Sequence, residues 1–208
     1  MKGIYMDINH GLKAYIEDNI LPRYEKFDDG HNIVHVRNVI GASLTLAKEF
    51  GAEMNRAYTV AAYHDLGLDK GREEHHIHSA AYLREDKRLN EWFSPEDIEI
   101  MAQAVEDHRA SGKSEPRSLY GKIVADADRE YTVERLLHRT VSYGKKNYPE
   151  LCEEEHLERA FDHCVNKYGP GGYMHFYLKS QVNNREMMRL HRLLENKQTF
   201  FAECKKYL

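Results

Sequence analysis

The sequence predicts an all-α protein, and two observations carry that prediction. Apolar residues recur three and four positions apart through nearly every segment of the 208 residues, which is the spacing of a buried helix face. No stretch longer than a few residues alternates apolar and polar side chains as a half-buried strand does. A bundle of amphipathic helices is therefore the expected architecture.

The first half of the chain is expected to form a succession of helices separated by polar turns. Pro22 bends or ends the first helix, because proline removes a backbone donor. Gly51 closes the second, and Leu66-Gly67 stops the third. The polar segment 69–74 is expected to be a loop. The helices are expected at about residues 8–20, 31–50, 53–66 and 75–86.

The clearest helix start in the chain is Ser94-Pro95-Glu96-Asp97. Serine is a good N-cap, proline suits the first turn, and acidic side chains suit the positive end of the helix dipole. This helix is expected to reach Asp107-His108. The residues Gly169 to Gly172 are the strongest helix breaker. Further helices are expected at about 119–143 and 151–168, with a final long amphipathic helix beyond the glycines, through Met187 to Phe201.

Composition excludes several classes of protein. The net charge is −4 with histidine neutral, so no global basic field is present to attract nucleic acid. The three cysteines form no CxxC pair, which argues against a zinc ribbon or a disulfide framework and favours reduced thiols. No apolar run approaches the roughly 18 residues of a membrane span. The first residues carry no apolar signal-peptide region, so a cytoplasmic protein with no membrane partner is expected.

Histidine is the compositional oddity, with 13 in the chain. His31 and His35 are one helical turn apart and share a face. The pair His64-Asp65 ends an apolar helix. Each of the other candidates also lies at a helix end or on an apolar helix: His75, His76 and His78 at a helix start, His108 at a helix end, and Asp126 and Asp128 in an apolar stretch.

The order of these residues carries more weight than any one of them. A single histidine at a helix end more often interacts with the helix dipole or with solvent. Here the candidates fall on successive separate helices, as a metal site inside a helical bundle requires. A mixture of imidazole and carboxylate suits a hard or borderline divalent cation. The pattern therefore indicates a metal site organised around His64 and Asp65.

The chain resembles the HD-domain superfamily of metal-dependent phosphohydrolases over about residues 28–145. All five motifs of that family occur in order, and the first departs from it in having Asn38 where arginine is frequent. The fold implied is an HD-domain helical bundle with C-terminal helices at about 146–208, all in a single domain 1–208. The five motifs are His35-Val36-Arg37-Asn38-Val39, Ala61-Ala62-Tyr63-His64-Asp65-Leu66-Gly67, His75-His76-Ile77-His78-Ser79-Ala80, Val105-Glu106-Asp107-His108 and Ala125-Asp126-Ala127-Asp128-Arg129.

The resemblance implies one or two divalent ions. Four core ligands match family positions: His35, His64, Asp65 and Asp126. In members with two metals, residues that match His75 and His108 bind the second ion, and the residue that matches Asp65 bridges the pair. The sequence does not distinguish Fe, Mn, Mg, Ni, Co and Zn. His76 or His78 remains the alternative to His75, Asp128 the alternative to Asp126, and His31, otherwise a surface or supporting residue, the alternative to His35.

The activity implied is hydrolysis of a phosphomonoester or phosphodiester of a phosphorylated small molecule, such as a nucleotide. A metal-activated hydroxide attacks phosphorus, and Asp65, His75 and His108 are assigned catalytic roles. Asp128 or Glu106 is expected to relay protons, and the alternative for either residue is a solvated carboxylate with no role in the reaction. A phosphate also needs cationic side chains close to the ligands. The candidates are Lys70, Arg72, Arg109, Arg117 and Lys122.

Two other functions use the same residues. Some relatives of this fold are di-iron oxygenases, and a metal or ligand sensor without turnover would keep the ligand set as well. The last helix is expected either to close the core or to form the seam of a homodimer.

Overall fold

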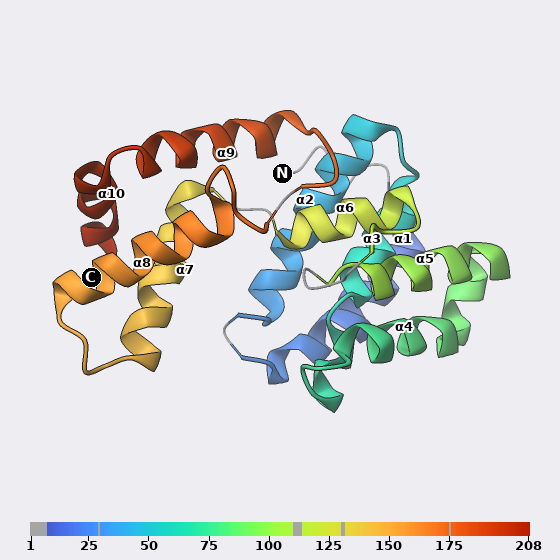
Figure 1. The fold of residues 1–208 in the computed structure, drawn as a ribbon. Coiled ribbons are helices and arrows are strands. Elements are labelled where there is room, and N and C mark those ends of the chain that lie inside the picture. Colours follow the sequence, from blue (N-terminus) through green and yellow to red (C-terminus); the bar gives the residue numbers. More distant parts are fainter. Residues whose placement is uncertain (1–7, 29, 110–113, 130–131, 175) are drawn as a thin grey trace. The chain divides into compact units, whose positions relative to one another are not determined.

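The structure is a computed structural model that describes residues 8–28, 30–109, 114–129, 132–174 and 176–208. Helices and turns account for the described residues, with no strand among them (Figure 1), which confirms the all-α prediction. The chain divides into two compact units, one ending at residue 130 and one beginning at residue 131. None of the described helices has the length and apolar character needed to cross a membrane.

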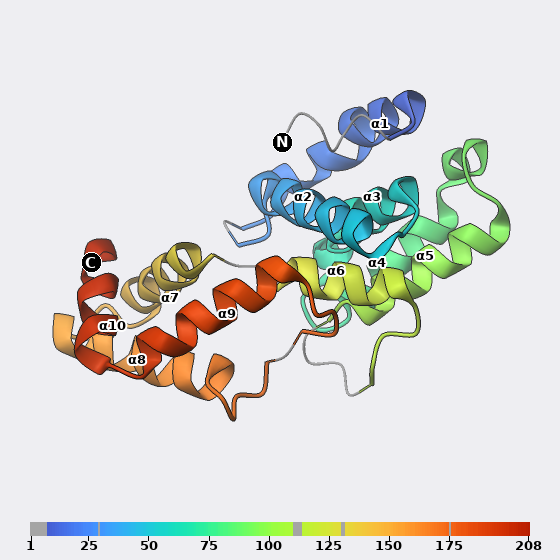
Figure 2. The ribbon, with the colours of Figure 1, turned by 90° about the horizontal axis from the view of Figure 1, so that it is seen from above.

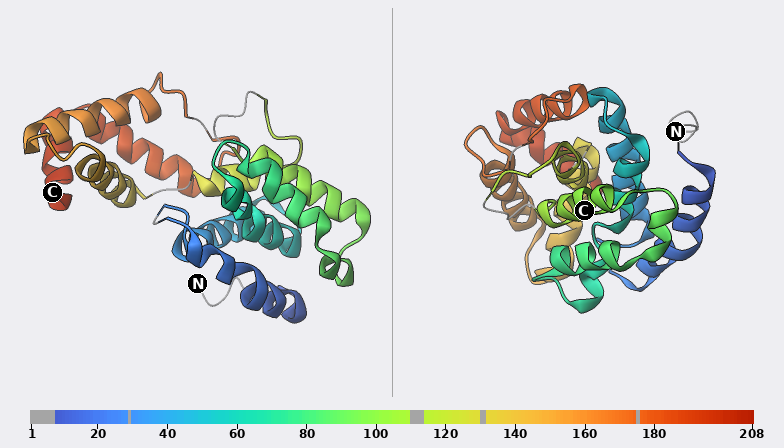
Figure 3. Two further views of the ribbon diagram at one scale, coloured as in Figure 1. Left: turned by 90° about the horizontal axis from the view of Figure 1, so that it is seen from below. Right: turned by 90° about the vertical axis from the view of Figure 1, so that its right-hand side faces the viewer.

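The first unit is built around α3, whose residues from Ala57 to Tyr63 are all buried. α2 lies beside α3 (Figure 2), and α4 lies beside α5 (Figure 3). α6 packs against α2, α3 and α5. The α-helices among the described residues of this unit are α1 (His10–Tyr15), α2 (Ile33–Phe50), α3 (Met54–Tyr63), α4 (His75–Glu85), α5 (Pro95–Asp107) and α6 (Leu119–Asp128).

Local chemistry explains where the helices of this unit begin and end. The Asn32 side chain accepts from the backbone N–H groups at the start of α2, and Gly51 ends that helix in the left-handed conformation with φ 68°. At α5, Ser94 and Asp97 form a capping box, and Pro95 is the first residue of the helix. These three boundaries agree with the sequence prediction.

Three expected helices are divided in the structure. After α1 the chain continues as a π-helical segment, Ile16–Ile20, and a 3₁₀ segment, Leu21–Lys26, whose first turn contains Pro22. The helix expected at 119–143 is two helices, because the Thr132 side chain caps a new start by accepting from the Arg135 N–H. Asn196 likewise starts a separate helix near the C-terminus by accepting from the Thr199 N–H.

In the second unit, the described α-helices surround an apolar core of their own. The unit boundary at residue 130 falls inside the segment of about 28–145 that the resemblance marks as the HD core, because α7 packs on α8, α9 and α10. The helices are α7 (Val133–Asn147), α8 (Glu153–Tyr168), α9 (Gln181–Leu194) and α10 (Lys197–Cys204).

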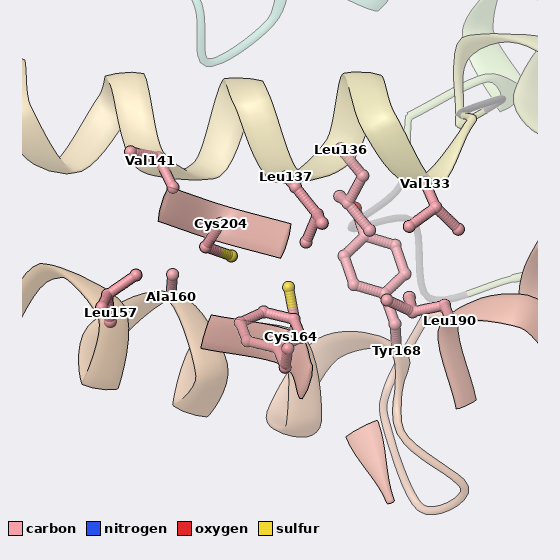
Figure 4. Close-up of a cluster of buried hydrophobic side chains, with 11 residues drawn as sticks. Val133, Leu136, Leu137, Val141, Leu157, Ala160, Cys164, Tyr168, Leu190 and Cys204 are labelled. Carbon is pink, nitrogen blue, oxygen red and sulfur yellow. The ribbon is translucent and has the colours of Figure 1, made fainter. Parts of the chain in front are cut away.

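Two of the three cysteines lie inside the second core. Cys164 and Cys204 are buried among apolar side chains (Figure 4), and Cys152 is exposed. Burial raises the pKa of each buried thiol to about 12. A thiol with that pKa is protonated near neutral pH and behaves as a small apolar side chain.

Candidate metal centre

His64 and Asp65 converge because α3 ends between them. His64 keeps helical backbone angles, whereas Asp65 has φ −110° and ψ 5°, so the chain leaves the helix at this residue. The two neighbouring side chains therefore point to one place, and His64 Nε2 lies 3.1 Å from Asp65 Oδ2. Both side chains are buried, with relative exposures of 0% and 3% for the two residues.

Three histidines of the cluster are held by the same local bond. The Nδ1 atom donates to the backbone carbonyl three residues earlier: His64 to Ala61 at 2.8 Å, His75 to Arg72 at 2.8 Å and His108 to Val105 at 2.6 Å. A donating Nδ1 places the lone pair of a neutral imidazole on Nε2. The hydrogen bond to the carbonyl thus fixes both the orientation of the ring and the nitrogen that it offers to a metal ion.

The ligand atoms form two groups that share Asp65. His35, His64 and Asp65 offer atoms that all lie within 4.8 Å of one another, and so do Asp65, His75 and His108. Asp65 divides its oxygens between them. Its Oδ2 lies 3.1 Å from His64 Nε2 and 3.5 Å from His35 Nε2. Its Oδ1 lies 3.4 Å from His75 Nε2 and 3.5 Å from His108 Nε2.

The donor set fits divalent cations. His35 Nε2 faces His64 Nε2 at 3.3 Å, and His75 Nε2 faces His108 Nε2 at 3.2 Å. Two lone pairs at that distance repel unless a proton or a cation lies between them. Imidazole nitrogens together with a shared carboxylate are ligands that Zn, Fe, Mn, Co and Ni all accept.

The charge states of Asp65 and His75 suit a cation. Burial would lower the pKa of His35, but the carboxylates of Asp128 and Asp65 raise it to about 9, so an ion bound there would displace a proton. Burial alone would raise the pKa of Asp65, but the imidazoles of His64, His108 and His35 hold it well below its usual range. Burial and the neighbouring His108 lower the pKa of His75 to about 4, which keeps that imidazole neutral. The cluster therefore offers an ionised carboxylate and at least one neutral imidazole ligand near neutral pH.

The structure brings Asp128, and not the preferred Asp126, to the histidines. Asp128 Oδ1 lies 3.3 Å from His35 Nε2 and 3.9 Å from His64 Nε2. Asp126 is fully buried on the same helix and lies 3.9 Å from the Arg129 guanidinium. Residues two apart on a helix point in nearly opposite directions, so only one of the two carboxylates can face the cluster.

His31, His76 and His78 were the alternatives to His35 and His75 in the sequence, and none of them belongs to either group of ligand atoms among the described residues. His75 contributes to the group that contains Asp65 and His108. His31 Nδ1 lies 2.8 Å from Asp28 Oδ1, and its ring packs edge-on to that of His35 with centroids 5.8 Å apart. His31 is thus a neighbour of a ligand candidate.

The five predicted phosphate-binding cations differ in what they contact. Arg109 donates to the Glu73 carbonyl at 2.5 Å. Arg117 pairs with Asp107 and Glu106, and Lys122 pairs with Glu115 at 2.6 Å. Lys70 and Arg72 are exposed, and among the described residues no acidic side chain lies within ion-pair distance of either.

Glu106, a predicted proton relay, is held by two arginines. Its Oε1 lies 2.7 Å from Arg84 and its Oε2 lies 2.5 Å from Arg117. Both carboxylate oxygens are therefore engaged in ion pairs on the side of α5. Glu106 is therefore part of a charged network between α4 and α5.

Sequence reasoning missed Tyr24. Its buried hydroxyl donates to the Ala62 carbonyl at 2.9 Å and accepts from the Asp65 N–H at 3.3 Å. Burial, and then the charge of Asp65, raises the pKa of Tyr24 well above its usual value, so the hydroxyl remains a donor. Tyr24 therefore holds the backbone where α3 ends. No local sequence signal links it to a residue 41 positions away.

Sequence and structure comparisons relate part of this chain to a known family. Residues 32–132 match the HD domain family. A structural match is the crystal structure of a predicted HD superfamily hydrolase from an uncultured Thermotogales bacterium. It shows 21% identity, covers 74% of this chain and 85% of that chain, and has a TM-score of 0.49. No curated protein matches the sequence.

Proposed function

We propose that the protein is a metal-dependent phosphohydrolase that cleaves a phosphomonoester or phosphodiester bond. The proposal starts from the match of residues 32–132 to the HD domain family. The observation that carries the proposal is that the two carboxylate oxygens of Asp65 face different pairs of histidines. One oxygen faces His35 and His64, and the other faces His75 and His108. A carboxylate shared in this way is suited to bridge two cations, and paired cations are the usual device for in-line displacement at phosphorus.

The residues that would hold the ions follow from the two groups. His35, His64 and Asp65, with Asp128 beside them, would hold one ion, and Asp65, His75 and His108 would hold the other. Such ions supply a hydroxide near neutral pH and polarise phosphoryl oxygens.

The protein's own contribution is orientation and charge. The three carbonyl bonds keep the imidazole rings in place, and Tyr24 holds the backbone of Asp65. Lys70 and Arg72 are exposed, and among the described residues no acidic side chain lies within ion-pair distance of either, although the charge of Arg72 acts on Asp28. Both cations are therefore candidates for a phosphate contact. A small phosphorylated substrate, such as a nucleotide, fits these charges.

The proposal is tested by metal analysis of the purified protein together with a panel of phosphatase and phosphodiesterase substrates. Bound transition metal and turnover of at least one phosphoester are expected, and both should be lost on treatment with a chelator. A protein that binds metal, consumes oxygen when loaded with iron and hydrolyses none of the panel is instead an oxygenase. Metal content and activity that survive in His64→Ala would contradict the metal centre itself.

The choice between the two aspartates gives a separate prediction. Asp128→Asn is expected to weaken metal binding by about tenfold or more, because it removes the carboxylate beside His35. Asp126→Asn is expected to lower the melting temperature with a smaller effect on metal affinity, because Asp126 is buried near Arg129. Titration of Mn²⁺ into the metal-free folded proteins measures both affinities. The reverse ranking would restore Asp126 as the ligand.

A further inference from the structure

The Asp65–His75–His108 group depends on two helix ends. His75 is the first residue of α4, and His108 is the residue that follows α5. The N-cap of α4 is Glu74, whose side chain makes no capping hydrogen bond. A helix start without such a bond is weakened by about 1 kcal/mol and frays more readily. The close packing of Gly67 on the first turn of α4 positions the backbone there, and a contact from the His108 side would add to that support.

Arg109 makes that contact. It follows His108 directly in the chain, and its Nη1 donates to the Glu73 carbonyl at 2.5 Å. The neighbouring carbonyl, that of Arg72, accepts the Nδ1 bond of His75 at 2.8 Å. One guanidinium thus joins the end of α5 to the backbone that orients the His75 ring. The Nε2 atoms of His75 and His108 lie 3.2 Å apart.

We propose that Arg109 is a positioning residue that holds the start of α4 against the end of α5 and so sets the spacing of His75 and His108. This assigns Arg109 to the ligand scaffold in place of the substrate contact expected from the sequence. The inference rests on the proposed metal-dependent function, which the two groups of ligands support.

The end of α5 is held by Arg117, independently of Arg109. The effect of Arg109 on His75 can therefore be tested separately from the stability of α5. Arg117 Nε donates to both oxygens of Asp107 at 3.0 and 3.1 Å, and its Nη2 donates to the Gln103 carbonyl at 3.1 Å. Arg117 also pairs with Glu106, so its direct partners all lie on α5. Glu106 in turn contacts Arg84 at the C-terminal end of α4, away from residues 71–78 in the chain. The bond from Arg109 reaches the segment that precedes α4. Loss of Arg109 should therefore loosen His75 and leave His108 in place.

Hydrogen exchange of the metal-free protein tests the contact directly. Arg109→Met keeps a long side chain without a donor, and Arg109→Lys keeps one charged donor. Faster deuterium uptake in residues 71–78 is expected for Arg109→Met, near-wild-type uptake for Arg109→Lys, and no change there for the matched control Arg117→Ala. Equal uptake in Arg109→Met and the wild type would overturn the proposal, as would the same increase in Arg117→Ala.

Titration calorimetry with Mn²⁺ tests the consequence for the metal centre. Arg109→Met is expected to weaken the ion held by His75 and His108 by about tenfold and to leave the ion held by His35 and His64 unchanged. Arg109→Lys should keep much of the wild-type affinity for that ion. A raised KM with unchanged metal affinity would show a substrate contact and overturn the positioning role. If the wild type binds no ion, the proposed function fails, and the exchange experiment still decides the structural role of Arg109.

Discussion

Asp65→Asn is expected to abolish binding of both ions and to lower hydrolysis by at least about 10³-fold, because the charge shared by the two groups disappears. Asp65 Oδ2 faces His64 at 3.1 Å, and Oδ1 faces His75 at 3.4 Å. Its pKa is held well below the usual range, so wild-type Asp65 is ionised. Asparagine keeps the shape and removes the anion. Metal analysis of the variant gives the result without reference to any substrate.

Two further variants serve as comparisons for the metal content of Asp65→Asn. His108→Ala removes a ligand of only one group, so it should lose one ion and keep the other. Asp18→Asn changes an exposed carboxylate on the π-helical segment and is expected to bind metal as the wild type does. An Asp65→Asn protein with full metal content would show that the histidines bind the ions without a shared carboxylate. Equal losses in Asp65→Asn and His108→Ala would contradict the bridging arrangement.

Gly67→Ala is expected to destabilise the first unit by about 3 kcal/mol or more. A Cβ at this position would lie 2.2 Å from the His75 carbonyl oxygen and 2.6 Å from the Ser79 nitrogen, both of which are backbone atoms of α4. The Gly67 N–H also donates to Ser79 Oγ at 2.8 Å. The first turn of α4 would have to move away, and His75 would move with it. Thermal denaturation of the metal-free protein measures the loss.

Gly41→Ala is the matched control for this substitution. Gly41 lies within α2, and a Cβ there would meet no atom within 4 Å. Alanine favours a helix interior over glycine by about 1 kcal/mol, so this variant should melt at the same or a higher temperature. If Gly67→Ala were as stable as Gly41→Ala, α4 would not pack as closely on Gly67 as the structure shows.

Helix boundaries that depend on local chemistry were predictable. Ser94 and Pro95 start α5, and Gly51 ends α2, because capping and the left-handed turn need only neighbouring residues. The break between α6 and α7 was missed, since no glycine or proline marks it. The threonine at position 132 was the available signal, and it is a weaker one because threonine also occurs inside helices.

The sequence named as a set the residues that lie together at the candidate metal centre, but it could not give their orientation. The sequence singled out the histidines and His64-Asp65 by their order along the chain. It could not choose between Asp126 and Asp128, because the helix phase at that point is set by packing against other helices. The partners of Arg109 were also out of reach, since Glu73 lies 36 residues away in the chain.

The carbonyl bonds of His64, His75 and His108 bear on how this centre tolerates sequence change. Each ring is oriented by a peptide oxygen, and every residue type carries that oxygen. Substitution of Ala61, Arg72 or Val105 therefore keeps the acceptor as long as the backbone keeps its path. Relatives can diverge widely around the ligands while the rings keep their tautomers. Selection on Ala61 and Val105, which are buried, then acts through backbone conformation and packing volume. Mutational scanning should find these two positions more permissive than the histidines they orient, whereas the side chain of Arg72 has the separate role proposed for it at the phosphate.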